Sequence, residues 1–418
     1  MPTKGKYKAP MPPPVSTGLS ASLADVSVEY GKRQRKQTPP RSWRTPVPHT
    51  PPVFAVADEA ALLHYLEENG YVVVQALNSD EVDAAEDQFW DDAAIAFGWD
   101  RDEPMTWEAR VAAQTLANRS DCGHIRGLDH SKFSWMLRKA PGVARVYNAI
   151  ARHFCGAADG EQQLASFNSL NVFRPHGLRS EWRTTSEPWY HVDNPKPDPR
   201  LGLHQPRLVF PGVLNLMPVS ADSGGFVAVP RSHLLFGARP NADSVASESD
   251  YLDISPFNNY LDSEPNHRVV PTNTLHTQPI LVCTGGRRGT ITIWDPRLVH
   301  CSTSSLTPLL SGGDEPARAS KHAACEPRLL RLASFVSLCP ASWAVDADAL
   351  AQRRKLVEER VCANSHIPYG VFTQRRFECL AFYEGIWADE AALRLVRGVV
   401  DEERREVRSR RNPNPIIA

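Results

Sequence analysis

The pattern of apolar and polar positions divides the chain into three parts. Residues 1–53 are rich in proline and poor in large apolar side chains. Such a segment cannot bury enough surface to offset the entropy lost on ordering, so we expect a mostly disordered arm. Residues 54–345 carry the periodic patterns of helices and strands, and residues 346–418 return to helical spacing before a charged tail. The sequence therefore predicts one folded domain with a C-terminal helical extension.

The folded part begins with a helix, a strand and a second helix. Residues 58–70, "DEAALLHYLEENG", have apolar positions at helical spacing and end in Asn-Gly, a typical helix stop. The next segment, "YVVVQAL", is rich in β-branched residues and predicts a strand. Residues 78–90, "NSDEVDAAEDQFW", start with an Asn-Ser-Asp cap, and the helical pattern continues to about His153.

From Ser166 onward the pattern changes to short strands separated by polar breaks. The strand-like segments are "SFNSLNVFRP", "RLVFPGVLNLMPV", "GGFVAVPRSH", "PILVC", "GTITIWD" and "RLASFVSL". Several short strands separated by turns predict a sandwich or barrel. A long polar insert at residues 234–279 interrupts them, and we expect a lid or binding loop because loops of that length are uncommon. The predicted fold class is mainly β with flanking helices.

Charge and composition narrow the functional classes. The formal net charge of −1 disfavours a protein that works by neutralising phosphates. The basic run "GKRQRK" in the arm is expected to be solvated, with a nuclear-import or nucleic-acid patch as the alternative. No apolar run reaches membrane-spanning length, so we expect no membrane insertion. The N-terminus lacks a signal-peptide core, and the 8 cysteines form no CxxC pair. We expect a cytoplasmic protein, with the nucleus as the alternative.

One short stretch, "SEPWYHVDNPKPDPR" at residues 186–200, carries the first candidate chemistry. His191 and Asp193 are two residues apart, so on a strand they face the same way while Val192 faces the other. One imidazole and one carboxylate directed at one point are two ligands of a 2-His-1-carboxylate iron site. The spacing alone is weak, because a hydrogen-bonded surface pair gives the same pattern.

A third ligand is required, and His300 has the most suitable setting. It closes "GTITIWDPRLVHCS", in which a strand is followed by a short turn and an apolar pair. In a jelly roll, strands far apart in sequence lie side by side, so the long gap from Asp193 is no obstacle. His233, in "PRSH", remains a rival. The other histidines considered lie in polar loops or at strand ends: His204, His267, His276 and His322.

Four motifs in order resemble the phytanoyl-CoA dioxygenase family: "WYHVDN", "NLMPVSADSGGFVAVPRSH", "GTITIWDPRLVHCS" and "RLASFVSLCP". The "GYVVVQALNSDEVDA" segment is also similar to that family, and the match covers about residues 60 to 345. The resemblance implies a double-stranded β-helix, which is a cupin-like jelly roll. It also implies a reaction that requires iron(II), 2-oxoglutarate and O2, and that ascorbate can stimulate. The family's iron ligands correspond to His191, Asp193 and His300.

The resemblance also suggests residues that bind 2-oxoglutarate. The family has an arginine about ten residues beyond the distal histidine, but here a longer loop intervenes and two arginines follow it. The strand "RLASFVSL" fits best when it starts at Arg331. We therefore expect Arg331 to bind the distal carboxylate of 2-oxoglutarate, with Arg328 as the alternative. A hydroxyl two residues past the distal histidine also helps to bind the co-substrate, and Ser302 has that position.

Residues near the substrate are less clearly indicated. Five polar residues from "DCGHIRGLDHSKFSWMLRKAPGV" and "NVFRP" are candidates for contact with a polar substrate: Arg126, His130, Arg138, Asn171 and Arg174. The alternatives are a helix–barrel interface for the first segment and a strand-edge cap for Arg174. Trp189 and Trp294 are expected to be core residues beside the metal, and Gly224-Gly225 is expected to form a turn.

These patterns lead to one main functional hypothesis. We expect an iron(II)/2-oxoglutarate dioxygenase that hydroxylates a small organic molecule with release of succinate and CO2. Asp193 favours hydroxylation, because halogenating relatives carry a small residue at that position. The alternatives are an oxygenase acting on a nucleobase or protein side chain, and a non-catalytic jelly-roll binding protein. The sequence indicates neither the substrate nor the oligomeric state.

Overall fold

The structure is a computed structural model of the whole chain. It describes residues 46–107, 123–183, 190–193, 208–237, 251–253, 278–306, 325–344, 347–362, 367–369 and 377–397. The expected lid insert lies mostly outside these residues, as do Trp189 and most of the N-terminal arm.

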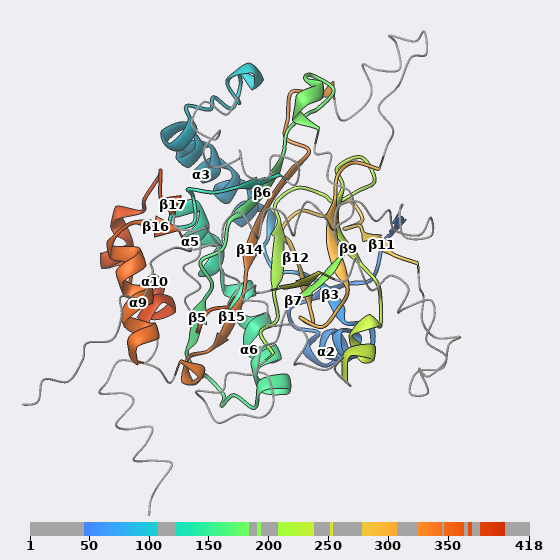
Figure 1. Cartoon of the computed structure of the whole chain (residues 1–418), viewed down its shortest axis with the longest axis vertical. Coiled ribbons are helices and arrows are strands. Elements are labelled where there is room, and N and C mark those ends of the chain that lie inside the picture. Colours follow the sequence, from blue (N-terminus) through green and yellow to red (C-terminus); the bar gives the residue numbers. More distant parts are fainter. Residues whose placement is uncertain are drawn as a thin grey trace, which may run out of the picture. The chain divides into compact units, whose positions relative to one another are not determined.

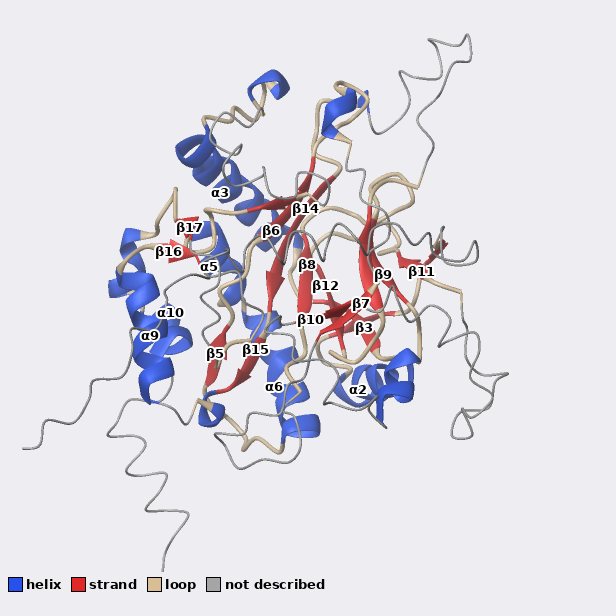
Figure 2. Ribbon diagram, viewed as in Figure 1, coloured by secondary structure: helices blue, strands red, loops and turns tan. Residues whose placement is uncertain are grey.

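Two β-sheets form the framework of the described fold (Figures 1 and 2). The larger sheet has the order β2 (Val53–Ala55), β3 (Tyr71–Gln75), β12 (Thr290–Trp294), β8 (Gly212–Asn215), β14 (Arg331–Val336), β6 (Leu170–Phe173) and β4 (His124–Ile125). The smaller sheet has the order β1 (Val47–His49), β11 (Ile280–Val282), β9 (Gly225–Ala228), β13 (His300–Thr303), β7 (His191–Asp193) and β10 (Tyr251–Asp253).

The chain crosses repeatedly between the two sheets. Strands β6, β8, β12 and β14 belong to the larger sheet, and β7, β9, β11 and β13 belong to the smaller one. This distribution is the arrangement of a double-stranded β-helix, and it confirms the predicted fold class. The described strands form two open sheets rather than one closed barrel.

Strand alternation gives the larger sheet two different buried faces. Val72 and Val74 of β3 belong to the apolar cluster that also contains residues of the helices. Tyr71 and Val73 belong instead to a cluster that joins both sheets and includes Phe226 of β9. Residues two apart on a strand share a face, so this second cluster marks the space between the sheets.

Helices cover the outer face of the larger sheet. They are α2 (Glu59–Asn69), α3 (Ser79–Phe97), α5 (Lys132–Arg138) and α6 (Pro141–Cys155). Helix α2 ends at Gly70, which has φ +79°, and α3 begins with a capping box between Asn78 and Glu81. The predicted helix–strand–helix entry is therefore confirmed. None of the described helices is both long and apolar enough to cross a membrane.

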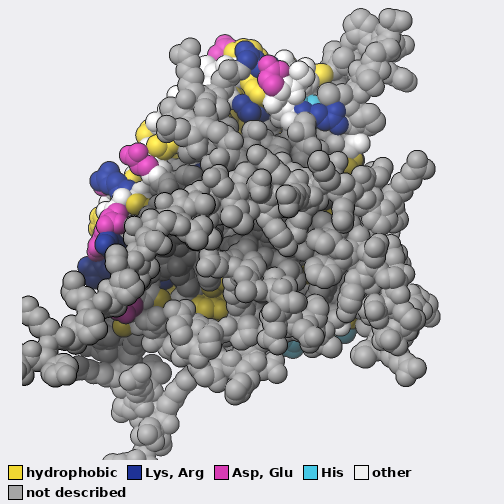
Figure 3. Space-filling view, viewed as in Figure 1, with side chains coloured by type: hydrophobic (Ala, Val, Ile, Leu, Met, Phe, Trp, Pro, Cys, Tyr) yellow, Lys and Arg dark blue, Asp and Glu magenta, His cyan; other side chains and the backbone are white. Residues whose placement is uncertain are grey.

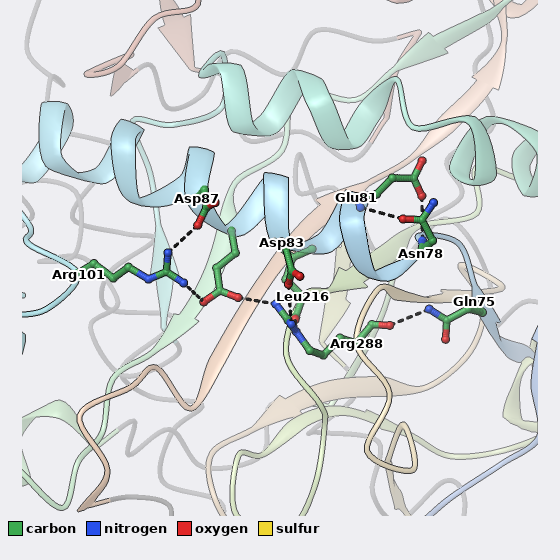
Figure 4. A network of polar contacts seen from close by, with 9 residues as sticks. Gln75, Asn78, Glu81, Asp83, Asp87, Arg101, Leu216 and Arg288 are labelled. Carbon is green, nitrogen blue, oxygen red and sulfur yellow. Dashed lines mark hydrogen bonds and ion pairs between the residues drawn. The ribbon is translucent and has the colours of Figure 1, made fainter.

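An ionic network fixes α3 to the loop between β11 and β12 (Figure 4). Arg288 contacts Asp83 at 2.8 Å and Glu86 at 2.5 Å, and its Nε donates to the carbonyl oxygen of Leu216 at 3.0 Å. Gln75 of β3 donates to the carbonyl oxygen of Arg288 at 2.7 Å. One arginine thus joins a helix to the end of the larger sheet.

Regular structure is also present in two segments that the sequence patterns did not predict as strands. Strand β1 lies within the predicted arm and pairs in parallel with β11, with Val47 opposite Ile280. Strand β10 lies within the predicted insert and pairs with β7, with Asp253 opposite His191. Both strands have three residues. A segment that short has too few alternating positions to predict a strand, and its backbone pairing comes from the neighbouring strand.

The C-terminal extension packs against the domain through α9 (Ala347–Glu358) and α10 (Glu390–Arg397). Two further small sheets lie in this region, β5 (Gln163–Ala165) with β15 (Leu338–Pro340), and β16 (Val361–Cys362) with β17 (Phe377–Glu378). The remaining short helices are η2 (Pro104–Thr106), η3 (Ser180–Trp182), η5 (Ser232–Gly237), η9 (Ala341–Trp343) and η10 (Glu384–Ala388).

Arg353 of α9 connects the extension to the domain. It is 1% exposed and donates to the carbonyl oxygens of Ala165 at 2.7 Å, Leu395 at 3.1 Å and Val396 at 3.3 Å. A further bond reaches the carbonyl oxygen of Pro368. A single buried guanidinium therefore binds carbonyl groups of β5, of the end of α10 and of Pro368, which lies between α9 and α10 in the chain.

We predict that Arg353→Leu lowers the free energy of unfolding by about 3 kcal/mol, because buried carbonyl groups lose their donors. Chemical denaturation checks this. The control is Arg354→Leu, which removes an exposed side chain paired with Glu358 and is expected to change stability by about 0.5 kcal/mol or less. Equal stability of the two variants would contradict the role of Arg353.

Candidate active site

Two strands of the smaller sheet bring three candidate metal ligands together. His191 and Asp193 lie on β7, and His300 lies on β13. One ligand atom from each residue lies within 4.8 Å of the others. The Nε2 atom of His300 is 3.5 Å from Asp193 Oδ2, and that of His191 is 4.0 Å from Asp193 Oδ1. The predicted set of three is therefore assembled at one point.

The strand register explains this assembly. His300 is directly opposite His191, and their ring centroids are 4.2 Å apart. Val192 and Cys301 alternate with these residues and lie in an apolar cluster on the other face of the sheet. The two imidazoles and the carboxylate therefore face the space between the sheets.

Hydrogen bonds orient the side chains of His300 and Asp193. His300 Nδ1 is 2.9 Å from the carbonyl oxygen of Leu298, which can only accept, so Nδ1 donates this bond and Nε2 is the nitrogen on the side of Asp193. Asp193 Oδ2 accepts a hydrogen bond of 2.9 Å from the indole Nε1 of Trp294. Trp294 is buried beside the candidate metal position, as the sequence predicts.

The rival ligand His233 lies elsewhere. Its Nε2 atom is 3.0 Å from the carbonyl oxygen of Glu67 on α2. A Cβ atom added to Gly70 would lie 2.4 Å from His233 Nδ1, which shows how tightly the ring packs there. His233 is thus held against α2 and is not part of the cluster of three.

Arg331 is the first residue of β14 and is buried, with 3% of its surface exposed. Its Nε and Nη1 atoms have no hydrogen-bond partner among the described residues. Burial lowers the pKa of Arg331 to about 10, so the group remains a cation at neutral pH. A buried cation without an anionic partner is costly, so this environment suits a bound carboxylate.

Gly225 of β9 lies close to Arg331 and pairs with β13, the strand that carries His300. A Cβ atom added to Gly225 would lie 2.5 Å from Arg331 Nη1. Gly225 pairs with Thr303, three residues beyond His300 on the same strand. Arg331 therefore extends from the larger sheet to the smaller one, between the sheets that enclose the histidines.

Four further residues singled out from the sequence lie near the histidine strand or near Arg331 in the chain. Gly224 has φ +68° and serves the expected turn, whereas Gly225 is needed for room beside Arg331. The second glycine of the Gly224-Gly225 pair is the sequence feature that could have indicated this need for room beside Arg331. Ser302 is two residues after His300 on β13, opposite Phe226, and is partly buried. Arg328 is exposed and pairs with Glu326 at 2.6 Å.

Two of the candidate substrate residues pack near the C-terminal extension. His130 is fully buried, and its Nε2 is 3.0 Å from the carbonyl oxygen of Val361. Burial lowers the pKa of His130 to about 3, so it is neutral at physiological pH. Arg138 donates to the carbonyl oxygens of Asp129 and Asn168. These contacts favour the helix–barrel interface over a substrate contact.

Arg174 and Arg126 have different surroundings. Arg174 Nη1 donates to the carbonyl oxygen of Trp107 at 2.8 Å, and its guanidinium lies 5.1 Å from the ring centroid of Trp182. This packing agrees with the cap at the end of β6. Arg126 is partly buried and close enough to Asp129 for their charges to interact.

Asn171 is the candidate that lies on the inward face. It is fully buried and pairs with Ala333, which belongs to the cluster between the sheets. Sequence patterns did not indicate a role for His124, which lies opposite Asn171 on β4 and stacks on Phe335 with ring centroids 5.2 Å apart. A strand of two residues gives no periodic signal that would have indicated its inward direction.

The family model for phytanoyl-CoA dioxygenase (PhyH) matches residues 66–308. This range is more than half of the 418 residues and contains all three candidate metal ligands. The chain belongs to the phytanoyl-CoA dioxygenase family. Members of this family are oxygenases that depend on iron and 2-oxoglutarate, so the protein is an enzyme of that class. Arg331 lies beyond the matched range.

Comparison with curated protein sequences gave no match. The chain is similar to the solved structure of the epimerase SnoN in complex with Fe3+, alpha ketoglutarate and nogalamycin RO, with 14% identity and a TM-score of 0.37. That match covers 68% of this chain and 84% of that one. For the carbocyclase SnoK from nogalamycin biosynthesis, the identity is 15%, the TM-score 0.36 and the coverage 70% and 87%. For EvdMO1 the identity is 16% and the TM-score 0.38, and the match covers 67% of this chain and 50% of that one.

We predict that His300→Ala abolishes binding of Co(II), used as a probe for iron(II), because a three-ligand site loses one imidazole. His233→Ala should retain binding, since its ring is held by Glu67. Titration followed by the visible absorption of Co(II) checks both variants, with circular dichroism to confirm folding. Loss of binding in His233→Ala together with normal binding in His300→Ala would show that the third ligand is misassigned.

Proposed function

We propose that this member of the phytanoyl-CoA dioxygenase family hydroxylates a small organic molecule, with His191, Asp193 and His300 as the iron(II) ligands. The observation that carries the proposal is the pairing of two features between the same two sheets. One is the cluster of two imidazoles and a carboxylate, and the other is the buried guanidinium group of Arg331, whose Nε and Nη1 have no hydrogen-bond partner among the described residues.

The donor set fits iron(II). Two imidazole nitrogens and one carboxylate on one face form the facial triad of non-haem iron oxygenases, which leaves coordination positions open. The orientation of His300, with its proton on Nδ1, supports this use of Nε2. A carboxylate at position 193 fills the place that a halide would need, which supports hydroxylation over halogenation.

The surroundings of Arg331 fit the distal carboxylate of 2-oxoglutarate. A guanidinium group binds a carboxylate through charge-assisted N–H donors, and Nε and Nη1 of Arg331, which have no hydrogen-bond partner among the described residues, are two such donors. The hydroxyl group of Ser302, on the strand that carries His300, is proposed as a further donor to the co-substrate. Arg328 is a poor alternative because its exposed side chain already pairs with Glu326.

When bound together with 2-oxoglutarate and O2, iron(II) supplies an oxidation that yields succinate, CO2 and a hydroxylated substrate. The protein contributes position and exclusion of water. His191, Asp193 and His300 fix the metal position on β7 and β13, and Arg331 fixes the depth of the co-substrate. Apolar neighbours between the sheets, including Phe226, keep bulk water from this region.

A small-molecule substrate is favoured by charge. The formal net charge is −1, and Figure 3 shows acidic and basic side chains mixed over the described part of one face. A protein that binds the phosphate backbone of a nucleic acid usually presents a continuous basic surface. Asn171 is proposed as a polar residue on the inward face that contacts the co-substrate or substrate.

We predict that purified protein with iron(II), O2 and ascorbate converts 2-oxoglutarate slowly to succinate even without substrate. Succinate is measured by mass spectrometry, and His191→Ala is the control because it lacks one proposed ligand. A jelly-roll protein without catalysis would produce no more succinate than this control, and that result would refute the proposed function.

We also predict that Arg331→Ala raises the 2-oxoglutarate concentration needed for half-maximal turnover by about ten- to a hundredfold, because charge-assisted hydrogen bonds contribute about 1.5–3 kcal/mol. Metal binding should persist, and Arg331→Lys should rescue only part of the loss. Arg328→Ala is the matched control. A large defect in Arg328→Ala and none in Arg331→Ala would move the assignment to Arg328.

A further inference from the structure

Trp294 lies at the end of β12, on the sheet opposite the candidate metal ligands. It is 4% exposed, and its Nε1 atom donates to Asp193 Oδ2 at 2.9 Å. We propose that Trp294 is a positioning residue whose indole N–H holds Oδ2 of Asp193 and so fixes the rotation of this carboxylate beside the two histidines. The inference rests on the proposed function, because it takes Asp193 as an iron ligand.

The tryptophan itself is held on several sides. Its ring stacks on Phe226 with centroids 4.5 Å apart and an interplanar angle of 29°, and it lies 5.1 Å from the ring of His300. Its backbone N–H donates to the carbonyl oxygen of Pro211 at 3.0 Å, and β12 places it opposite Tyr71 of β3. The indole N–H therefore has a defined direction before any ligand binds.

A carboxylate without such a donor has more freedom than an imidazole. It can rotate about its terminal torsion, and it can bind a metal through one oxygen or through both. Two-oxygen binding would occupy a position that the co-substrates need. A hydrogen bond from Trp294 to Oδ2 disfavours that arrangement, because it fixes the rotation of the carboxylate and occupies one acceptor direction of Oδ2.

The charge of the Asp193 carboxylate strengthens its hydrogen bond with Trp294. The hydrogen bond joins a neutral N–H donor to a carboxylate in a buried environment, where such bonds are stronger than those between two neutral groups. Among the described residues, the other polar neighbours recorded for this carboxylate are the imidazoles of His191 and His300, the remaining candidate ligands. Among the side chains that the structure describes, Trp294 is thus the contact from outside the ligand set that orients Asp193.

The test compares Trp294→Phe with Trp99→Phe. Trp99 is 1% exposed, and its Nε1 has no hydrogen-bond partner among the described residues, so the same substitution removes ring area without removing a bond. Co(II) affinity is measured by titration without 2-oxoglutarate, and thermal unfolding of the metal-free proteins is measured separately. We expect Trp294→Phe to bind Co(II) about ten- to a hundredfold more weakly, and Trp99→Phe to bind like the wild type.

A second variant separates the hydrogen bond from ring packing. Benzothienylalanine at position 294 keeps the shape of the two fused rings but has sulfur in place of N–H, and it should bind Co(II) as weakly as Trp294→Phe. Wild-type affinity in either 294 variant would overturn the inference while leaving the proposed metal site intact. Failure of the wild-type protein to bind Co(II) would instead refute the metal site itself.

Discussion

The pairing of β13 with β7, which sets His300 opposite His191, is the contact on which the candidate site depends. A shift of β7 by one residue would turn His191 outward and bring Val192 inward, and the same shift of β13 would exchange His300 and Cys301. Val192 and Cys301 lie in an apolar cluster on the outer face, so such a shift would expose apolar surface and bury polar groups in an unsuitable place. Apolar packing of Val192 and Cys301 on one face of these strands thus fixes the positions of His191 and His300 on the other face.

The opposite sheet completes the site from residues far away in the chain. Arg331 extends from β14 to Gly225 on β9, and Trp294 extends from β12 to Asp193 on β7. Each contact spans the space between the sheets. The buried charge of Arg331 lowers the stability of the ligand-free fold, and a bound carboxylate would recover that cost. The apolar residues around it provide the stability that permits a charged group there.

The helices and the extension support this framework from outside. Arg288 joins α3 to the end of the larger sheet, and Arg353 joins α9 and α10 to β5. His130 and Arg138 contribute to the same junction, which explains why their chemistry is directed to backbone carbonyls. Polar residues that looked suited to a substrate therefore connect layers of the fold instead.

By itself the sequence determined the features that depend on local spacing. These are the helix–strand–helix entry, the mainly β class, the paired His191 and Asp193, and a strand beginning at Arg331. Only the tertiary structure decided which polar residues meet. The hydrogen bond from Trp294 to Asp193 joins residues 101 positions apart, and strand β1 exists because β11 offers its edge. Periodicity records which face a side chain occupies, but it does not record what the other sheet places against that face.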